Sequence, residues 1–547
     1  MTKQKRIALI LLISLVSQVL VSAQATAPAP SGLKTLPELQ TRISEILAKP
    51  ELASGMVGIK VVSLDTGRVL FEENSTKLLR PASNMKLYTV ATALDKLTPD
   101  YRFKTTVYGS MKLNASGVLR GNLIIYGRGD PSFAARFNNG DYLKAINDLA
   151  ARIAAAGVKR VEGDLVGDES YFVGPKYGSG WEWEDLTWYY GAEISPLTVN
   201  DNALDLFIKP GHAVTAAAVI TTGPPDPLLT IVNRVVTASR GTKRELNIYR
   251  GVGENTVTIS GNIAIDDPGY TGAIAISHPA LLFVYLLRTA LAQKGVVVTG
   301  KSLATGTVNQ PSLPLIPEIA KVSGAPIPKV QFEITTFESQ PFSVIAAQTL
   351  KPSQNLYTEL ILRTLGTMTT PPPTMGPFRQ TSENLGLEAV KSFLKTAGIA
   401  AESLRLDDGS GLSRGDMITA EATVQLLTFM NKHRYADVFR AALPIAGIDG
   451  TLRNRMRGTP AENNVRAKTG SLTGAASLGG YVTTAAGEKL VFAIIVNNYS
   501  NDVEPRTICI DPIAVLLASF SGKSDGQDNT RITNGTKPPD KPNPEKK

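Results

Sequence analysis

Three short polar motifs occur in this chain in a fixed order, and the distances between them limit the fold more than any other feature of the sequence. Ser83 and Lys86 form an S-x-x-K, Ser353 and Asn355 form an S-x-N, and Lys468 begins a Lys-Thr-Gly that occurs once. Ser353 follows Ser83 by 270 positions, whereas Lys468 follows Ser353 by 115. A fold that brings the three motifs together must therefore accommodate long additional segments after the first motif.

The S-x-x-K motif stands at the start of a predicted helix, whose apolar residues recur at helical spacing as Leu87, Val90, Leu94 and Leu97. Residues three apart on a helix share a face, so Lys86 is predicted to lie beside Ser83. A neighbouring amine can take the proton of an acylating serine if burial or a second cation lowers its pKa from about 10.4. The pattern alone is not decisive, because Ser31 to Lys34 and Ser392 to Lys395 also match it.

The other two motifs each have an ordinary interpretation when taken singly. Pro352 separates two helix-like segments and leaves Ser353 and Asn355 on the intervening turn, a polar composition that is common in turns. Lys468 lies in a β-like run, so its side chain is predicted to point to the face opposite that of Thr469. An ordinary exposed lysine of a strand would fit this position as well. An S-x-x-K at a helix start, an S-x-N on an inter-helix turn and a K-T-G on a strand, in this order, together indicate an acylating serine site.

With these motifs the sequence resembles the D-alanyl-D-alanine carboxypeptidase/endopeptidase family of class C low-molecular-mass penicillin-binding proteins. The resemblance covers nearly all of residues 40–520 and includes Gly127–Ser132, Val199–Asn202, Asp408–Arg414 and Ala446–Leu452. It implies a multi-domain α+β fold, in which inserted β-rich domains interrupt a β-lactamase/transpeptidase-like catalytic domain with an antiparallel sheet and helices.

The resemblance also implies a role for each motif residue. Ser83 would be the nucleophile and Lys86 its base, Ser353 would relay the proton to the leaving amine, and the residues expected to bind substrate are Asn355, Lys468, Thr469 and Ser471. The expected substrates are peptidoglycan stem peptides, the expected inhibitors are β-lactam antibiotics, and neither a cofactor nor a metal is implied.

The segment from Trp181 to Tyr190 contains all three tryptophans of the chain beside several acids. In the resembling family an aromatic residue and an aspartate of this segment meet the side-chain end of the stem peptide. Trp181 and Asp185 are the candidates, with Glu184 as the alternative to Asp185. An acid at this place would favour a substrate side chain that ends in a free amine.

Two other functions remain as alternatives. A β-lactamase shares the three motifs, but the 270-residue separation is longer than compact β-lactamases leave. A non-catalytic peptidoglycan-binding protein could keep the fold, but it would not need Ser83, Lys86, Ser353 and Lys468 together.

The amino terminus indicates export. Lys3, Lys5 and Arg6 precede an apolar run to Val21 and a small-residue cleavage site at Ala23, which is typical of a secretory signal. A membrane anchor is the alternative, but the run is shorter than the ~20 residues that cross a bilayer. We therefore expect an exported protein, periplasmic or associated with the cell wall, without a stable membrane span in its mature form.

Composition excludes several other classes of protein. The net charge of +9 includes the signal and a basic tail, and the sequence lacks the basic blocks of nucleic-acid binders. The three histidines, His212, His278 and His433, lack ligand spacing, so no metal site is expected. Cys509 stands alone in an apolar stretch and is expected to be a buried structural thiol.

The changes in composition along the chain, with the resemblance, predict the domain organisation. The predicted units are a signal peptide (1–23), a flexible linker (24–35), a catalytic domain in two parts (36–101 and 341–521), an inserted domain II in two parts (102–200 and 262–340), an inserted domain III (201–261) and a disordered tail (522–547).

Overall fold

The structure is a computed structural model that describes residues 33–224, 226–305 and 331–525. The two ends of the described chain meet in a five-stranded antiparallel sheet. In spatial order its strands are β19 (Arg466–Leu472), β20 (Ala475–Thr483), β21 (Lys489–Asn497), β1 (Met56–Ser63) and β2 (Val69–Glu73). The hairpin of β1 and β2 and the hairpin of β20 and β21 thus form one sheet, because β1 pairs with β21 along its whole length.

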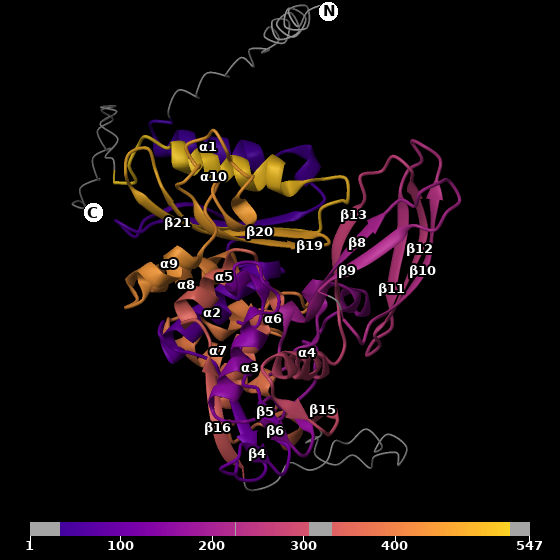
Figure 1. Cartoon of the computed structure of the whole chain (residues 1–547). Helices are drawn as coiled ribbons and strands as arrows, with labels where there is room; N and C mark the ends of the chain where they lie inside the picture. Colours follow the sequence, from indigo (N-terminus) through magenta and orange to yellow (C-terminus); the bar gives the residue numbers. More distant parts are fainter. Residues whose placement is uncertain (1–32, 225, 306–330, 526–547) are drawn as a thin grey trace, which may run out of the picture.

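Helices cover both faces of this sheet (Figure 1). α1 (Leu36–Leu47) and α10 (Asp511–Ser519) lie on one face, and α8 (Ala420–Lys432) packs on the other. Side chains alternate between the two faces of a strand, so Phe492 and Ile494 of β21 enter the core under α1 and α10, whereas Val491 and Ala493 enter the core under α8. Both faces of the sheet are therefore buried.

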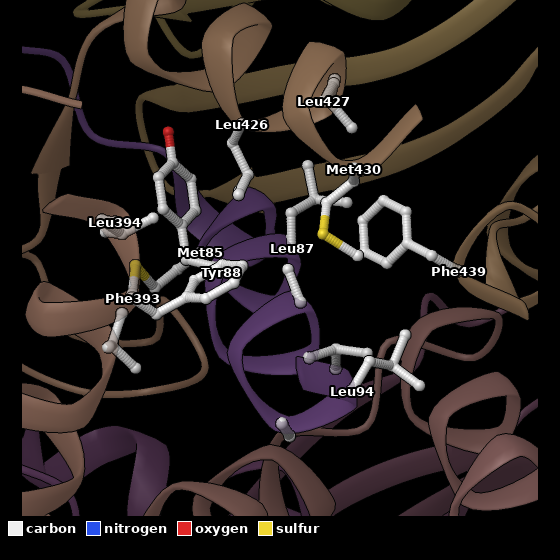
Figure 2. Close-up of a cluster of buried hydrophobic side chains, with 14 of the residues drawn as sticks. Met85, Leu87, Tyr88, Leu94, Phe393, Leu394, Leu426, Leu427, Met430 and Phe439 are labelled. Carbon is white, nitrogen blue, oxygen red and sulfur yellow. The ribbon is translucent and has the colours of Figure 1, made fainter. Parts of the chain in front are cut away.

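The helix that follows Ser83 is the centre of the helical part. α2 (Met85–Leu97) is buried over most of its length, including Lys86, and Figure 2 shows its side chains among those of surrounding helices. Besides α8, these helices are α5 (Phe342–Leu350), α6 (Asn355–Thr367), α7 (Ser382–Thr396) and α9 (Ala436–Ala442). Because protein cores are closely packed, α2 fixes the place of the residues at its start.

The region between the first two motifs forms a second five-stranded sheet. Its strands in spatial order are β15 (Ser302–Thr305), β7 (Leu165–Asp168), β5 (Leu123–Tyr126), β3 (Lys104–Gly109) and β16 (Phe332–Glu338), and α3 (Lys144–Ala155) and α4 (Pro279–Gln293) pack on it. Lys104 of β3 stands opposite Glu338 of β16, so the region departs and returns on adjacent strands.

A smaller lobe is inserted within this region in the same way. β8 (Ala203–Lys209) pairs with β13 (Tyr270–Ala275), and between them the chain forms β9 (Val219–Gly223), β10 (Thr230–Ala238), β11 (Glu245–Arg250) and β12 (Thr256–Ala264). Position 261, the end predicted for domain III, falls inside β12. The remaining short strands are β4 (Val118–Leu119), β6 (Arg160–Val161), β14 (Val297–Val298), β17 (Leu404–Arg405) and β18 (Met417–Ile418).

The chain ends bear on several predictions from the sequence. The predicted signal peptide, most of the linker and residues 526–547 of the predicted tail lie outside the described residues. Ser524, within the predicted tail, is buried and its backbone N–H donates to Glu488 Oε2 at 2.9 Å, so the packed body extends beyond residue 521. None of the helices in the described ranges is long and apolar enough to cross a membrane.

Cys509 is a buried free cysteine, as expected. Burial raises the pKa of its thiol to about 12, which leaves the thiolate unpopulated at neutral pH.

Candidate active site

Ser83 lies on a tight turn at the start of α2. The turn is a single 3-10 segment (η2, Ala82–Asn84), and Ala82 has a φ of 47°, a left-handed value that is uncommon for a residue other than glycine. The Asn84 side chain donates to Ser477 of β20, and Ser477 donates to the carbonyl of Pro81 at 2.6 Å. These two hydrogen bonds fix the turn to the sheet and leave Ser83 partly exposed.

Lys86 is fully buried one turn along α2, and its Nζ has three hydrogen-bond partners. It lies 2.9 Å from Ser83 Oγ, 2.6 Å from Asn355 Oδ1 and 2.7 Å from the carbonyl oxygen of Ser410. Burial disfavours a charged amine and lowers the pKa of Lys86 to about 7, although the nearby carboxylates of Asp408, Glu359 and Asp416 oppose the shift.

The proton count at Lys86 shows what the arrangement can do chemically. An ammonium group has three donors and no acceptor, which matches the three oxygens around Nζ. After loss of one proton, two N–H groups remain for Asn355 and Ser410, and the lone pair faces Ser83 Oγ. The neutral amine is therefore placed to accept the proton of the serine hydroxyl, which is the geometry required of a general base.

The second and third motifs meet at Ser353. Ser353 has a φ of 66° on the turn between α5 and α6, and its Oγ accepts from Lys468 Nζ at 2.9 Å. Lys468 also donates to the carbonyl of Thr469 at 2.8 Å. Burial, with the nearby cations of Lys86 and Arg455, holds the pKa of Lys468 well below its usual range. The two lysines are thus neighbours: Lys86 is hydrogen-bonded to the serine of its own motif, and Lys468 to the serine of the second motif.

Asn355 occupies a helix position that the sequence did not predict. It is the first residue of α6 and not part of the preceding turn, because Gln354 acts as the N-cap and accepts from the backbone N–H of Leu356. The amide oxygen of Asn355 contacts Lys86, and its amide nitrogen donates to the carbonyl of Tyr190 at 2.9 Å. This second contact joins α6 to the inserted region.

A neighbouring loop supports the Ser353 turn. Lys351 Nζ lies 2.5 Å from Asp449 Oδ2, and the backbone N–H of Thr451 donates to the carbonyl of Lys351 at 3.0 Å. Thr451 Oγ1 accepts from Thr469 Oγ1 at 2.7 Å, which connects the loop to β19. Ser471 is exposed two residues further along the same strand.

The tryptophan-rich segment contacts this centre at three points. The indole N–H of Trp181 donates to Asp408 Oδ2 at 2.8 Å, Glu182 pairs with Arg414, and Tyr190 accepts from Asn355. Trp181 and Asp185 are both partly exposed, and burial raises the pKa of Asp185.

The contacts missed by sequence reasoning are mainly backbone groups. The carbonyls of Ser410 and Tyr190 hold Lys86 and Asn355, and Ser477 holds the turn of Ser83, yet no side-chain pattern marks these positions. Only the stretch Asp408–Arg414 carried a signal, as part of the family resemblance without a role.

A separate pocket of about 430 Å³ lies among the inserted elements. It is lined by Ala134, Ala135, Arg136, Tyr142, Tyr189, Asn200, Asp201, Ala203, Asp205, Gly223 and Ala273. This lining contains no serine, cysteine or lysine, whereas the cluster around Ser83 joins a serine hydroxyl to a buried amine. The cluster around Ser83 is therefore the candidate site for acyl transfer.

Comparison with known proteins shows the family of the chain. Residues 39–520 match the D-Ala-D-Ala carboxypeptidase 3 (S13) family. A D-alanyl-D-alanine carboxypeptidase of Actinomadura sp. (strain R39) is 33% identical over 530 residues, which cover 95% of this chain and 91% of that protein. The chain therefore belongs to the S13 family and is a serine-type D-Ala-D-Ala carboxypeptidase.

Solved structures show the same fold. The crystal structure of penicillin-binding protein 4 from Haemophilus influenzae has a TM-score of 0.72 at 24% identity, over 88% of this chain and 99% of that one. A structure of the same protein in complex with a β-lactam has a TM-score of 0.67 at 21% identity, over 87% and 97%. The multi-domain α+β fold expected from the sequence is confirmed.

Gly411 tests how closely the loop behind Ser83 must pack. A Cβ at Gly411 would lie 1.9 Å from the carbonyl oxygen of Ala82, whereas a Cβ at Gly67, which has a similar φ, would meet no atom within 4 Å. We expect Gly411→Ala to slow covalent labelling by a fluorescent penicillin by roughly 100-fold, because the turn of Ser83 must shift. Gly67→Ala, the matched control, should label at the wild-type rate. Equal labelling of both variants would show that the turn tolerates displacement.

Proposed function

We propose that this enzyme hydrolyses the bond between the two terminal D-alanines of peptidoglycan stem peptides through an acyl-enzyme on Ser83. The observation that carries the proposal is the hydrogen-bond set of Lys86, which leaves its lone pair facing Ser83 Oγ when the amine is neutral. The reaction begins when Ser83 Oγ attacks the scissile carbonyl and its proton passes to Lys86. The backbone N–H groups of Ser83 and Ser471 would stabilise the oxyanion.

The tetrahedral intermediate collapses when the leaving amine receives a proton. Ser353 Oγ, hydrogen-bonded to Lys468, is the group proposed to relay to this amine the proton that Lys86 took from Ser83, which leaves Lys86 neutral again. D-alanine departs, the acyl group remains on Ser83 as an ester, and a water molecule whose proton is taken by Lys86 hydrolyses the ester. The serine hydroxyl is thereby restored, and the net reaction consumes one water.

Lys468, Thr469 and Ser471 are proposed to hold the terminal carboxylate of the substrate, while Asn355 holds the peptide amide. Lys468 has a depressed pKa beside Lys86, and an incoming carboxylate would favour its charged form. A β-lactam presents a carboxylate and a reactive carbonyl to the same groups, so it should acylate Ser83 and inhibit the enzyme.

Substitution of Ser83 tests the nucleophile. Wild-type protein should bind a fluorescent penicillin covalently and release D-alanine from a pentapeptide, and Ser83→Ala should do neither, because no other side chain is in reach of Lys86 as nucleophile. Ser392→Ala is the matched control, since Ser392 begins another S-x-x-K but is exposed on α7. Mass spectrometry of the labelled chains gives the measurement, and a labelled Ser83→Ala chain would contradict the proposal. Nitrocefin turnover separates a β-lactamase from a peptidase.

The pH dependence tests the base. Only neutral Lys86 accepts a proton, and its pKa is about 7, so the acylation rate should rise about tenfold per pH unit below pH 7 and level off above it. Acylation by a fluorescent penicillin between pH 5 and 9 gives the profile, with circular dichroism as a check that the fold persists. A rate that stays constant or falls between pH 5 and 7 would exclude Lys86 as the base.

Asp185 is proposed to meet a free amine at the end of the stem-peptide side chain, with Trp181 beside it. Loss of a hydrogen bond to a charged group costs about 1.5–3 kcal/mol, so Asp185→Asn should lower kcat/KM for a free-amine substrate by about tenfold or more. The same substrate with its amine acetylated is the matched control and should be nearly unaffected. A loss at Glu184→Gln instead would assign the contact to Glu184.

We further propose that residues 1–23 are a cleaved signal and that the enzyme acts in the periplasm or at the cell wall. The basic start, apolar run and small-residue site at Ala23 support this proposal. Protein recovered from the periplasm should begin at Gln24, and a chain that retains Met1 there would contradict cleavage.

A further inference from the structure

Three carboxyl groups are buried near Lys86. Glu359 of α6, Asp408 and Asp416 are each fully shielded from solvent. None of them contacts Lys86 directly, because all three partners of its Nζ are uncharged oxygens. A positive charge on Lys86 is therefore balanced by carboxyl groups in its neighbourhood, and not by a direct ion pair with one of them.

Asp408 is the acceptor in each hydrogen bond that its carboxyl group makes. Its Oδ1 accepts from the backbone N–H groups of Ser410 and Gly411, at 3.0 and 2.6 Å. Its Oδ2 accepts from Ser410 Oγ at 2.9 Å, from Leu412 and Ser413 N–H at 3.1 Å each, and from Trp181 Nε1 at 2.8 Å. These hydrogen bonds hold the Asp408 carboxyl group in one orientation against the 410–413 loop and the indole of Trp181.

Glu359 and Asp416 have the opposite surroundings. Glu359 Oε1 accepts from Gly409 N–H at 3.0 Å and Asp416 Oδ1 from Asp407 N–H at 2.7 Å, whereas Oε2 and Oδ2 have no hydrogen-bond partner. Burial and then the neighbouring charge of Asp408 hold the pKa of both carboxyls well above the usual range. Burial therefore disfavours the ionised form of both of these groups.

Other charged groups lie around the cluster, and each has contacts of its own. Arg363 of α6 donates to the carbonyls of Pro175 and Tyr177 and lies 3.9 Å from Glu383 of α7. Lys468 of β19 is a neighbour of Lys86, and a positive charge on one of these amines disfavours a positive charge on the other. Asp407, next to Asp408, accepts from Ser413 Oγ at 3.3 Å.

We propose that Asp408 is a positioning residue that sets the pH range in which Lys86 acts as the base. It acts through Ser410, whose N–H and hydroxyl bind Asp408 and whose carbonyl binds Lys86. It also acts through the charge of its carboxylate, which opposes the effect of burial on Lys86 more than the charges of Glu359 and Asp416 do. The inference rests on the proposed function, in which Lys86 accepts the proton of Ser83.

The contact with Trp181 extends this role to the inserted region. The indole N–H lies on the oxygen of Asp408 that three donors of the 410–413 loop also share. Trp181 thus withdraws part of the negative charge that acts on Lys86. A substrate that moves the tryptophan changes the basicity of the catalytic amine.

The test is the pH profile of acylation by a fluorescent penicillin, measured on the full chain. Asp408→Asn should move the acidic limb down by about one pH unit or more, because a nearby opposite charge shifts a pKa by ~1–3 units. Asp416→Asn and Glu359→Gln, which replace carboxyl groups with smaller effects on Lys86, should move the limb by less than Asp408→Asn does. An unmoved limb in folded Asp408→Asn, or a downward shift in either control as large as that of Asp408→Asn, would overturn the assignment.

A further variant covers the case in which Asp408→Asn does not fold. The amide nitrogen of an asparagine at this position would face N–H donors, with which it forms no hydrogen bond. Trp181→Phe keeps the ring and removes one donor from Asp408, so the acidic limb should move upward, and a limb that stays or moves downward would refute the charge assignment. A merely structural role for Asp408 would change the amount of folded enzyme and not the position of the limb. A wild-type profile without an acidic limb would contradict Lys86 as the base, and with it this inference.

Discussion

The burial of Lys86 among three neutral oxygens is the constraint on which the rest of the structure depends. A fully buried amine loses its charge at a pH where an exposed lysine keeps it, and this loss makes it a base for the adjacent serine. The three oxygens come from the turn before α2, from α6 and from the 408–414 loop. Close packing of these elements is therefore a chemical requirement as well as a source of stability.

The sequence predicts the parts of this site that depend on local pattern. Apolar spacing after Ser83 predicts α2, Pro352 predicts the break before α6, and the run around Lys468 predicts β19. The domain order follows from the long separation between the first two motifs together with the family resemblance. These features are predictable because each is encoded within a few consecutive side chains or in their spacing.

Other features depend on contacts between distant parts of the chain and could not be predicted. The pairing of β1 with β21 joins segments that no periodicity relates. The carbonyls of Ser410 and Tyr190 act through the backbone, so any residue type could occupy those positions. The helical place of Asn355 depends on the capping by Gln354, a residue that leads few helices and gave no boundary signal.

The sheet that unites the two ends of the chain also orders events during synthesis. The turn before Ser83 is held by Asn497, whose side chain accepts from Arg80 N–H at 2.7 Å across 417 positions of sequence. Chains emerge from the ribosome amino terminus first, so the inserted region can collapse long before β21 exists. The turn that carries Ser83 and Lys86 therefore lacks its support from β21 until almost the whole polypeptide has been made. A truncated product would contain both residues without the sheet contact that holds their turn.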